Sequence, residues 1–462
     1  MSTKLTDGLN EGQISAYTDI TGWLSRRDDH DMWVLQGYAG TGKTFLLGRV
    51  IRNALMGHTK WKIGMTAPTN KAVKVLEKMC DVKDTRVSFQ TVHRMLGLRE
   101  KITDDGRQVF ERDPFLGTVD IHTYGLVIVD EASMLNDELF KELENYRNHV
   151  KFLFVGDPAQ IPPVGKDDAI PFDEAARQKW RIKVAHLDEV MRQAAEHPII
   201  ARSMVIRNAL TRPRPLDTYS TVIKEGRGIT YINTNVQEHR ESIEPLLKEL
   251  FNCKEFREDP DHAKVIAWRN ATVASFNNII RGQLYGPGSS KLVIGEKLIA
   301  DKPIVDPSTG EIIFTTNEEF EVAEYKIKRS IFGPSDDTEC ELGYYEAVVQ
   351  RGYGEERVRK VIRILHEDSE IAFKRNSETI RKKALSSKSK RGWRDFYDFI
   401  REFAEVNYNY AITAHKAQGS TYKNVVLAED DIEYNRNTVE KNRIRYTAYT
   451  RPTDMLYILK RT

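Results

Sequence analysis

The 462-residue sequence has little cysteine, no long apolar stretch and almost no excess of charge. Its three cysteines, Cys80, Cys253 and Cys340, lie far apart without a CxxC pair. This pattern argues against a zinc site or a disulfide framework and fits a reducing cytoplasm. No run of about 18 apolar residues occurs, so we expect no membrane span. The first residues, MSTKLTDGLNEGQ, contain no apolar signal segment, so we expect a cytoplasmic location.

The near balance of charge also limits the function classes. Lys plus Arg number 70 against 68 for Asp plus Glu, a formal charge of +2. Such a balance does not announce a nucleic-acid-binding protein, so any binding surface of that kind must concentrate its basic residues locally. Hydrophobic residues make up 40% of the chain, which is enough for real cores. The length is too great for one compact core, so we expect two or more domains.

Short apolar runs alternate with helix-like segments in two parts of the chain. This alternation predicts parallel sheets covered by helices, and therefore two α/β domains. The first set of runs comprises residues 32–36, 62–67, 125–129 and 151–155, and the second comprises 264–268, 424–428 and 455–459.

Two other segments are less regular. Residues 99–119 carry Asp104-Asp105-Gly106 between polar and apolar stretches, which predicts a small hairpin. Residues from about 290 to 400 are strand-rich at first and then become basic, where they are helical or loop-like. We expect the second segment to be an insertion in the second α/β domain.

Residues 37–44, GYAGTGKT, fit the pattern G-x-x-x-x-G-K-[ST] between an apolar strand and a helix-like segment. The glycines let backbone N–H groups turn toward a phosphate, and the helix N-terminus adds its dipole. Lys43 would neutralise the β- and γ-phosphates, and the Thr44 hydroxyl would ligate Mg²⁺. The alternative is an ordinary glycine-rich turn. The predicted nucleotide-binding residues are Gly37, Gly40, Thr41, Gly42, Lys43 and Thr44.

An acid pair, Asp130 and Glu131, directly follows the apolar run Val127-Ile128-Val129. The carboxyl ends of strands are where open α/β sheets bind ligands. Asp130 suits Mg²⁺, and Glu131 suits a general base that orients the attacking water. Alone, such a pair is more often part of a solvated loop, but beside the phosphate loop it predicts nucleotide hydrolysis. What the hydrolysis drives stays open, because unrelated functions share this fold.

Seven further ordered blocks resemble the superfamily 1 helicases, in particular the 5′→3′ branch and its bacteriophage Dda-type members. The resemblance covers nearly the whole chain. The blocks are TAPTNKAVKVL (66–76), TVHRML (91–96), VIVDEASM (127–134), GDPAQIPPVG (156–165), LDEVMRQ (187–193), YAITAHKAQGSTYKNVVL (410–427) and YTAYTR (446–451).

The resemblance implies an α/β fold with two RecA-like P-loop motor domains. It also implies a small hairpin insertion in the first domain and a larger β-rich, SH3-like insertion in the second. The expected boundaries are 1–98 and 120–183 for the first motor domain, 99–119 for the hairpin, 184–289 and 404–462 for the second motor domain, and 290–403 for the β-rich and basic insertion.

The resemblance also implies roles at the nucleotide. Gln13 corresponds to a glutamine that reads adenine, since a side-chain amide can pair with both N6 and N7. An ordinary helix-surface glutamine is the alternative. Gln160, in GDPAQ, corresponds to a residue that senses the γ-phosphate and couples the nucleotide to bound DNA. A simple turn residue is the alternative there.

Arg192 and Arg451 resemble the two arginines of the second motor domain that reach the γ-phosphate. A permanently charged guanidinium can stabilise the charge that develops in phosphoryl transfer. The alternative for each is a surface side chain. This sequence departs from the family beside Arg451, because Pro452 stands where a small residue is usual and Tyr449 replaces a smaller aliphatic residue.

Two nucleic-acid tracks are implied, one in each motor domain. Hydroxyls, a short glycine and a lysine can hold phosphates without reading bases, which suits a motor that accepts any sequence. A polar helix start or a structural histidine is the alternative. The predicted track residues are Pro68, Thr69, Asn70, Lys71 and His93 in the first domain, and Thr413, His415, Lys416, Gln418, Gly419, Ser420 and Thr421 in the second.

Two aromatic residues are further candidates for DNA contact. Residues 374–403 interleave basic and aromatic side chains, which suits a single strand, and Trp393 is the best single candidate in this stretch. The alternatives are a solvated charged face and an aromatic core of the insertion. Phe110 follows the predicted hairpin turn and resembles the aromatic wedge that splits duplexes in Dda-type enzymes. Packing of the hairpin is its alternative.

The sequence therefore predicts an ATP-dependent DNA helicase that moves 5′→3′ on single-stranded DNA and unwinds the duplex ahead, with ATP and Mg²⁺ as cofactors. A translocase that displaces bound proteins and an ATP-switched binding module are the alternatives. Expected partners are single strands, strand junctions and proteins of replication or recombination. We expect a working monomer, located in the host cytoplasm if a phage encodes it.

Overall fold

The computed structural model describes residues 3–26, 29, 31–80, 82–103, 108–112, 121–191, 196–216, 218–305, 312–351, 358–387 and 389–461. The chain divides into two compact units. The first contains Met1–Gly97, Asp113–Val273 and Ile412–Thr462, and the second contains Leu98–Arg112 and Ala274–Ala411. Both six-stranded sheets lie in the first unit. The predicted bounds of the four domains stay a prediction.

The first sheet has strand order β3-β2-β6-β7-β1-β8, and every neighbouring pair is parallel. Its strands are β1 (Met32–Gly37), β2 (Lys62–Ala67), β3 (Val87–Thr91), β6 (Tyr124–Val129), β7 (Lys151–Gly156) and β8 (Ile182–Leu187). The four predicted apolar runs coincide with β1, β2, β6 and β7. These strands are buried along nearly their whole length, which explains why they appear as continuous apolar runs rather than as alternating patterns.

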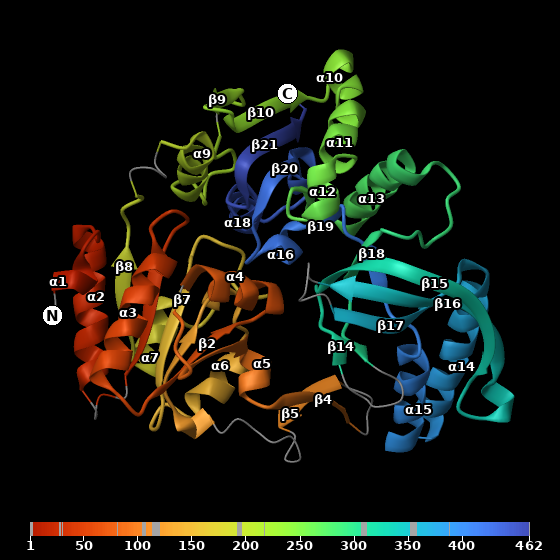
Figure 1. The fold of residues 1–462 in the computed structure, drawn as a ribbon, viewed down its shortest axis with the longest axis horizontal. Coiled ribbons are helices and arrows are strands. Elements are labelled where there is room, and N and C mark those ends of the chain that lie inside the picture. The colour runs from red at the N-terminus through yellow and green to blue at the C-terminus, as the bar shows by residue number, and fades with distance from the viewer. Residues whose placement is uncertain are drawn as a thin grey trace. The chain divides into compact units, whose positions relative to one another are not determined.

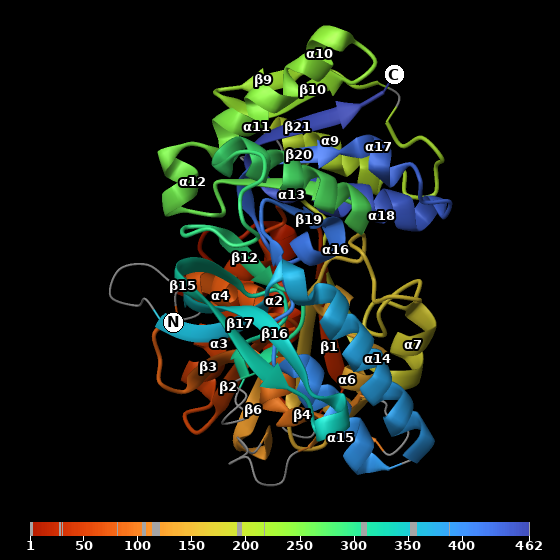
Figure 2. The same cartoon turned by 90° about the vertical axis from the view of Figure 1, so that its right-hand side faces the viewer.

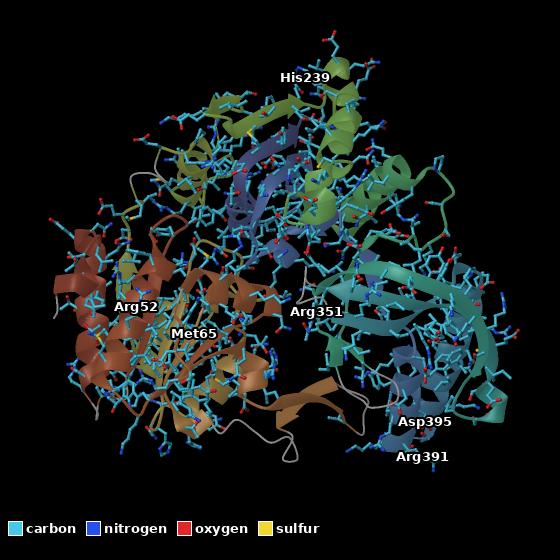
Figure 3. The ribbon with its side chains drawn as sticks, viewed as in Figure 1. Arg52, Met65, His239, Arg351, Arg391 and Asp395 are labelled. Atoms are coloured by element: carbon cyan, nitrogen blue, oxygen red, sulfur yellow. The ribbon has the colours of Figure 1, made fainter. Side chains whose placement is uncertain are left out.

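The helices of this part pack their apolar side chains on the sheet. Ile20 of α2, Leu47 of α3 and Met65 of β2 belong to one buried cluster, and Figure 3 labels Met65 among the strands. The helices are α1 (Thr3–Thr6), α2 (Glu11–Ser25), α3 (Lys43–Gly57), α4 (Asn70–Cys80), α5 (Val92–Met95), α6 (Asp137–Glu144) and α7 (Glu174–Trp180), with 3₁₀ turns η1 (Ile121–Thr123) and η2 (Ala132–Met134).

The second sheet has strand order β19-β11-β20-β21-β10-β9. Its strands are β9 (Val222–Lys224), β10 (Arg227–Asn233), β11 (Ala263–Ala267), β19 (Ala411–Thr413), β20 (Tyr422–Ala428) and β21 (Pro452–Lys460). Pairs among β11, β20, β21 and β10 are parallel, while β9 runs antiparallel to β10. Strands β11, β20 and β21 contain the second predicted set of apolar runs, so the α/β fold is confirmed.

Helices cover both faces of the second sheet, with α11 and α12 on one side of β20 and β21 and with α9 and α18 on the other (Figures 1 and 2). The helices of this part are α9 (Pro198–Arg207), α10 (Gln237–Glu241), α11 (Ile243–Phe251), α12 (Lys254–Glu258), α13 (Asn270–Tyr285), α16 (Ala414–Ala417), α17 (Glu429–Ile432) and α18 (Thr438–Tyr449). No helix among the described residues is long and apolar enough to cross a membrane.

The second unit is built on a five-stranded antiparallel sheet of order β17-β16-β15-β12-β18. Its strands are β12 (Lys297–Ala300), β15 (Glu319–Phe332), β16 (Cys340–Arg351), β17 (Val358–Leu365) and β18 (Val406–Tyr408). Two small antiparallel pairs accompany it, β13 (Ile304–Val305) with β14 (Ile312–Phe314), and β4 (Leu98–Ile102) with β5 (Gln108–Arg112).

The basic stretch 374–403 is largely helical, which is one of the two forms that the sequence predicts. It forms most of α14 (Glu370–Ser387) and α15 (Lys390–Arg401), and the 3₁₀ turns η3 (Asp336–Thr338) and η5 (Glu367–Ser369) precede them. Figure 3 labels Arg391 and Asp395, one helical turn apart on α15. The apolar faces of α14 and α15 contribute Ile380 and Phe399 to a cluster that includes Tyr344 of β16.

Candidate nucleotide and nucleic-acid site

The loop between β1 and α3 has the shape of a phosphate cradle. Gly40 and Gly42 adopt left-handed φ angles of 80° and 79°, which only glycine accepts without strain. A Cβ on Gly42 would lie 2.5 Å from Nε2 of Gln13, and a Cβ on Gly37 would lie 2.7 Å from Oγ1 of Thr41. Sterics therefore require glycine at these positions. The helix begins at Lys43, so its N-terminal amides face the loop.

Lys43 closes the loop on itself. Its Nζ donates to the carbonyl oxygens of Gly37, at 2.7 Å, and of Tyr38, at 3.1 Å. Thr41 is fully buried, and its hydroxyl donates to the Tyr38 carbonyl at 2.9 Å. Thr44, the predicted metal ligand, follows Lys43 in the first turn of α3. The ammonium group is thus held beside the space that the loop amides surround.

Gln13 lies against the cradle, but its amide is already engaged. Nε2 donates to the Thr41 carbonyl at 3.0 Å, and Oε1 accepts the backbone N–H of Asn10 at 3.1 Å. The second bond belongs to a capping box that starts α2. Adenine contact by Gln13 stays a prediction, and it would require this amide to change partners.

The acid pair lies at the carboxyl end of β6. The Asp130 N–H donates to the Thr66 carbonyl of β2 at 2.8 Å, and Glu131 takes a left-handed φ of 50°. Burial, and next the neighbouring Glu131 carboxylate, raise the pKa of Asp130 to about 7, while Lys43 opposes the shift. A non-glycine residue held in this left-handed region carries backbone strain, and such strain clusters at functional sites.

Gln160 lies in the loop after β7, which is the strand between β6 and β1. Its side chain is 5% exposed, and Oε1 has no hydrogen-bond partner among the described residues. Its own N–H donates to the Asp157 carbonyl at 3.2 Å, so the turn is fixed from the backbone. A buried amide oxygen without a partner is unusual, and it suits a residue that awaits a ligand or water.

Residues of α18, together with Gln418 at the end of α16, contact this edge of the first sheet. The Ile161 N–H donates to Oγ1 of Thr447 at 3.3 Å, and Nε2 of Gln418 donates to the Ile161 carbonyl at 3.0 Å. The Tyr446 hydroxyl accepts the N–H of Ala39 in the cradle at 3.2 Å. The sequence analysis predicted a nucleic-acid role for Gln418. The buried Gln418 amide contacts the loop after β7 and, at 3.4 Å, the Ser133 hydroxyl, and its nucleic-acid role stays a prediction.

Of the two predicted γ-phosphate arginines, Arg451 is described and Arg192 lies outside the described residues. Arg451 is 5% exposed and donates to carbonyl oxygens of Thr447, at 3.0 Å, and Ser420, at 3.1 Å, and to the Thr450 hydroxyl at 2.9 Å. Among the described residues no carboxylate forms an ion pair with it. Its charge is therefore available for an anion once the guanidinium turns.

The predicted track of the first motor domain surrounds the start of α4, after Pro68. The Thr69 hydroxyl caps this helix by accepting the Ala72 N–H at 3.2 Å, and Asn70 begins it. Lys71 forms an ion pair with Asp261 at 2.8 Å, and its Nζ lies 4.7 Å from the centroid of the Tyr422 ring. A phosphate contact by Lys71 therefore competes with Asp261.

Both predicted track histidines are partly buried. His93 lies in α5, and His415 lies in α16 beside Lys416. Burial lowers the pKa of each imidazole, so both are neutral near pH 7. A neutral imidazole can donate one hydrogen bond to a phosphate but adds no charge.

In the second track, Thr413 caps α16 by accepting the Lys416 N–H at 3.3 Å. Ser420 is 1% exposed, whereas Thr421 is exposed. Gly419 has a left-handed φ of 71°, and a Cβ there would lie 3.2 Å from Cβ of Ala72 and 3.6 Å from Cγ of Glu131. Glycine therefore lets the track loop of the second domain lie directly against the acid of the first.

The two aromatic candidates differ. Trp393 is 7% exposed and contacts the rings of Phe396, at a centroid distance of 6.0 Å, and Tyr397, at 6.4 Å. This burial favours the packing alternative, because a base cannot stack on a ring that is already covered. Phe110 lies on β5 opposite Glu100 of β4. The hairpin turn around residue 105 lies outside the described residues.

Two known protein families match this chain, and the two matched segments follow each other along the sequence. Residues 8–221 match the AAA domain family, and residues 408–459 match the UvrD-like helicase C-terminal domain family. The ATP-dependent DNA helicase dda of Enterobacteria phage T4 is 24% identical over 441 residues, which are 93% of this chain and 94% of that protein. Over nearly its whole length the chain is similar to Dda-type superfamily 1 helicases. It is therefore a DNA helicase and an ATPase.

Two further comparisons are a shorter match and a more distant structure. The ATP-dependent RecD2 DNA helicase of Deinococcus radiodurans is 34% identical over 198 residues, which are 43% of this chain and 24% of that protein. A crystal structure of Pif1 helicase from Bacteroides in complex with ADP-AlF3 and ssDNA has a TM-score of 0.47 and 14% identity. That match covers 96% of this chain and 91% of the Pif1 chain.

Helicases of this family bind a nucleotide with a divalent metal, and the side chains here fit both groups. Among the described residues no cluster of three or more His, Cys, Asp or Glu side chains could hold a metal alone. Thr44 and Asp130 are the residues that would hold the cation, together with phosphate oxygens. The raised pKa of Asp130 records a shortage of positive charge that such a cation would supply.

Sequence reasoning missed several residues of this helicase site. Asp157 is fully buried and accepts the Tyr446 hydroxyl at 2.7 Å. The Arg207 guanidinium carbon lies 3.9 Å from the centroid of the Tyr38 ring in the cradle. The blocks GDPAQ and YTAYTR contain Asp157 and Tyr446, so these motifs could have identified both residues. Nothing local in the sequence marks Arg207.

Proposed function

We propose that the chain is a monomeric ATP-dependent DNA helicase that translocates 5′→3′ along single-stranded DNA and unwinds the duplex ahead. The observation that carries this proposal is the approach of Gly419, in the track of the second motor domain, to Glu131, the acid of the first. A strand held by that track lies next to the residue that would orient the hydrolytic water. Hydrolysis and strand movement are thereby coupled by direct contact.

At the nucleotide, Lys43 and the loop amides of residues 37–44 would hold the phosphates of ATP. The Thr44 hydroxyl and Asp130 would hold Mg²⁺, which supplies positive charge to the phosphate oxygens. Glu131 orients the attacking water, and Gln160 offers its unpaired amide oxygen beside it. Arg451 leaves its carbonyl partners for the γ-phosphate when the cleft between the two sheets closes, and Arg192 is proposed as the second arginine.

Two grips then move relative to each other, one near Thr69–Lys71 and one near Thr413–Thr421. Closure and reopening of the cleft is a hinge motion that shortens and lengthens the distance between the grips. Lys71 takes part by exchanging Asp261 for a phosphate oxygen of the strand. The 5′→3′ direction follows from the Dda-type resemblance.

ATP hydrolysis stimulated by single-stranded DNA tests the nucleotide half of the proposal. Lys43→Ala removes the cation of the cradle, so we expect hydrolysis to fall to background while oligothymidylate binding persists. Lys62→Ala, which removes an exposed lysine at the start of β2, is the matched control and should keep full activity. Normal turnover in Lys43→Ala would contradict the assignment of the cradle.

The wedge role of Phe110 is a separate part of the proposal. An apolar ring inserted at a base step offsets the cost of unstacking, so Phe110→Ala should weaken duplex unwinding. The two grips and the nucleotide site are untouched by this change, so DNA-stimulated hydrolysis should persist. Strand-displacement rates at matched hydrolysis rates are the measurement. Unchanged displacement would assign Phe110 to packing of the hairpin.

A further inference from the structure

The Tyr446 side chain of α18 contacts two functional loops of the first motor domain. Its hydroxyl accepts the Ala39 N–H of the cradle at 3.2 Å and donates to Oδ2 of Asp157 at 2.7 Å. Tyr446 is 1% exposed and Asp157 is fully buried. One hydroxyl of α18 therefore joins the phosphate cradle to the loop after β7.

The direction of these hydrogen bonds is fixed by chemistry. Burial, and next the negative charge of Asp157, raise the pKa of Tyr446 well above its usual range, so the phenol keeps its proton. A carboxylate only accepts, so the hydroxyl donates to Asp157. Its oxygen is then the acceptor for Ala39. The backbone N–H groups of this loop are the donors that a phosphate needs, and in this structure the tyrosine occupies one of them.

The contact continues to the nucleic-acid track. Thr447, next to Tyr446, accepts the Ile161 N–H at 3.3 Å, and the Ile161 carbonyl accepts Nε2 of Gln418 at 3.0 Å. Farther along the chain, Arg451 donates to the Ser420 carbonyl at 3.1 Å. Both Gln418 and Ser420 belong to the track loop. A displacement at Tyr446 is thus transmitted to this loop through packed helix and hydrogen bonds.

We propose that Tyr446 is a positioning residue that links occupancy of the phosphate cradle to the grip of the second motor domain on single-stranded DNA. This inference rests on the proposed function. A phosphate competes with the tyrosine for the Ala39 N–H, so nucleotide binding breaks this one hydrogen bond while Asp157 keeps the hydroxyl. The track loop then changes its hold on the strand. By linkage, strand binding changes nucleotide affinity by the same factor.

The test compares two tyrosines of one helix. Tyr446→Phe removes the linking hydroxyl. Tyr449→Phe removes a hydroxyl that is equally buried but has no hydrogen-bond partner in the part of the chain that the structure describes, so it is the matched control. Anisotropy of a labelled oligothymidylate gives the dissociation constant with and without a saturating non-hydrolysable ATP analogue and Mg²⁺. The ratio of the two constants is the coupling factor.

We expect Tyr446→Phe to lower the coupling factor about tenfold, which is the change that the loss of one hydrogen bond to a charged group would cause. If the wild-type factor is smaller than ten, the variant should show no coupling, that is, a factor of one. It should also bind a fluorescent ADP more tightly than wild type does, because a competitor for the Ala39 N–H is gone. Tyr449→Phe should match wild type in both. Unchanged coupling in Tyr446→Phe, or equal loss in Tyr449→Phe, overturns the inference. A wild-type protein that binds neither probe overturns the proposed function instead.

Asp157→Asn provides a second route if Tyr446→Phe unfolds at a lower temperature than Tyr449→Phe. The amide keeps the shape of the carboxylate but weakens its hold on the hydroxyl. The variant should lower the coupling factor by itself. Adding Tyr446→Phe should cause little further loss, because both changes break the same link. Multiplicative losses in the double variant would show two independent effects and overturn the inference.

Discussion

Replacing Gly42 with alanine should damage the cradle by a predictable amount. Gly42 has a φ of 79°, and this left-handed conformation costs an alanine roughly 1–2 kcal/mol. The new Cβ would lie 2.5 Å from Nε2 of Gln13, so this amide must leave the Thr41 carbonyl. The lost buried hydrogen bond is worth about 1 kcal/mol. A combined cost of about 2–3 kcal/mol, where it falls on binding, corresponds to a roughly 30- to 150-fold loss of nucleotide affinity.

Titration with a fluorescent ADP measures this loss, and thermal unfolding shows how much of the cost falls on stability. Gly57→Ala is the control, because Gly57 is the last residue of the same helix, α3, and a Cβ there meets nothing within 4 Å. The control should bind like wild type. If Gly42→Ala keeps both the wild-type affinity and the wild-type Tm, then neither the left-handed turn nor its contact with Gln13 shapes the cradle.

Three other predictions concern Asp130, Asp261 and Gly22. Asp130 has a pKa of about 7 when folded and 3.8 when exposed, so between these values the folded state binds an extra proton and metal-free stability falls as pH rises. In EDTA, Asp130→Asn should therefore gain in Tm over wild type from about pH 5 to about pH 8, and a constant difference would contradict this. Asp261→Asn releases Lys71 from its ion pair, so it should tighten oligothymidylate binding at low salt, and this gain should be lost at high salt. If the variant and the wild type bind with equal affinity at low salt, the ion pair does not restrain Lys71. Gly22→Ala, in α2 with open space around it, should raise stability by about 0.5–1 kcal/mol, and a lower Tm would show hidden crowding.

The parts of the fold that sequence reasoning predicts are those with a strong local signal. Strands β1, β2, β6 and β7 are continuous apolar runs that are buried on both faces. Strand β8 has an interrupted burial pattern, and β19 has only three residues, so neither produces a run that stands out. For the basic stretch 374–403 the sequence does not separate helix from loop, because its charges hide the apolar side of α15.

The residues of the candidate site also fall into two groups, those with a local sequence signal and those whose contacts depend on packing. The cradle and the acid pair are contiguous in sequence, and their spacing alone indicates their chemistry. Gln418 and Tyr446 act on residues 257 and 289 positions away, Ile161 and Asp157, so their contacts depend on how the two sheets pack. Lys71 was predicted to bind a strand, but its ion pair with Asp261 depends on the same packing. Local pattern cannot report contacts of this kind.

Strand displacement from two DNA forks tests the central claim most directly, with ATP and Mg²⁺ present. One fork carries a 5′ single-stranded tail and the other a 3′ tail. The account predicts unwinding from the 5′ tail only. Unwinding from the 3′ tail only would contradict the assigned direction, and DNA-stimulated hydrolysis without displacement from either fork would contradict the unwinding itself.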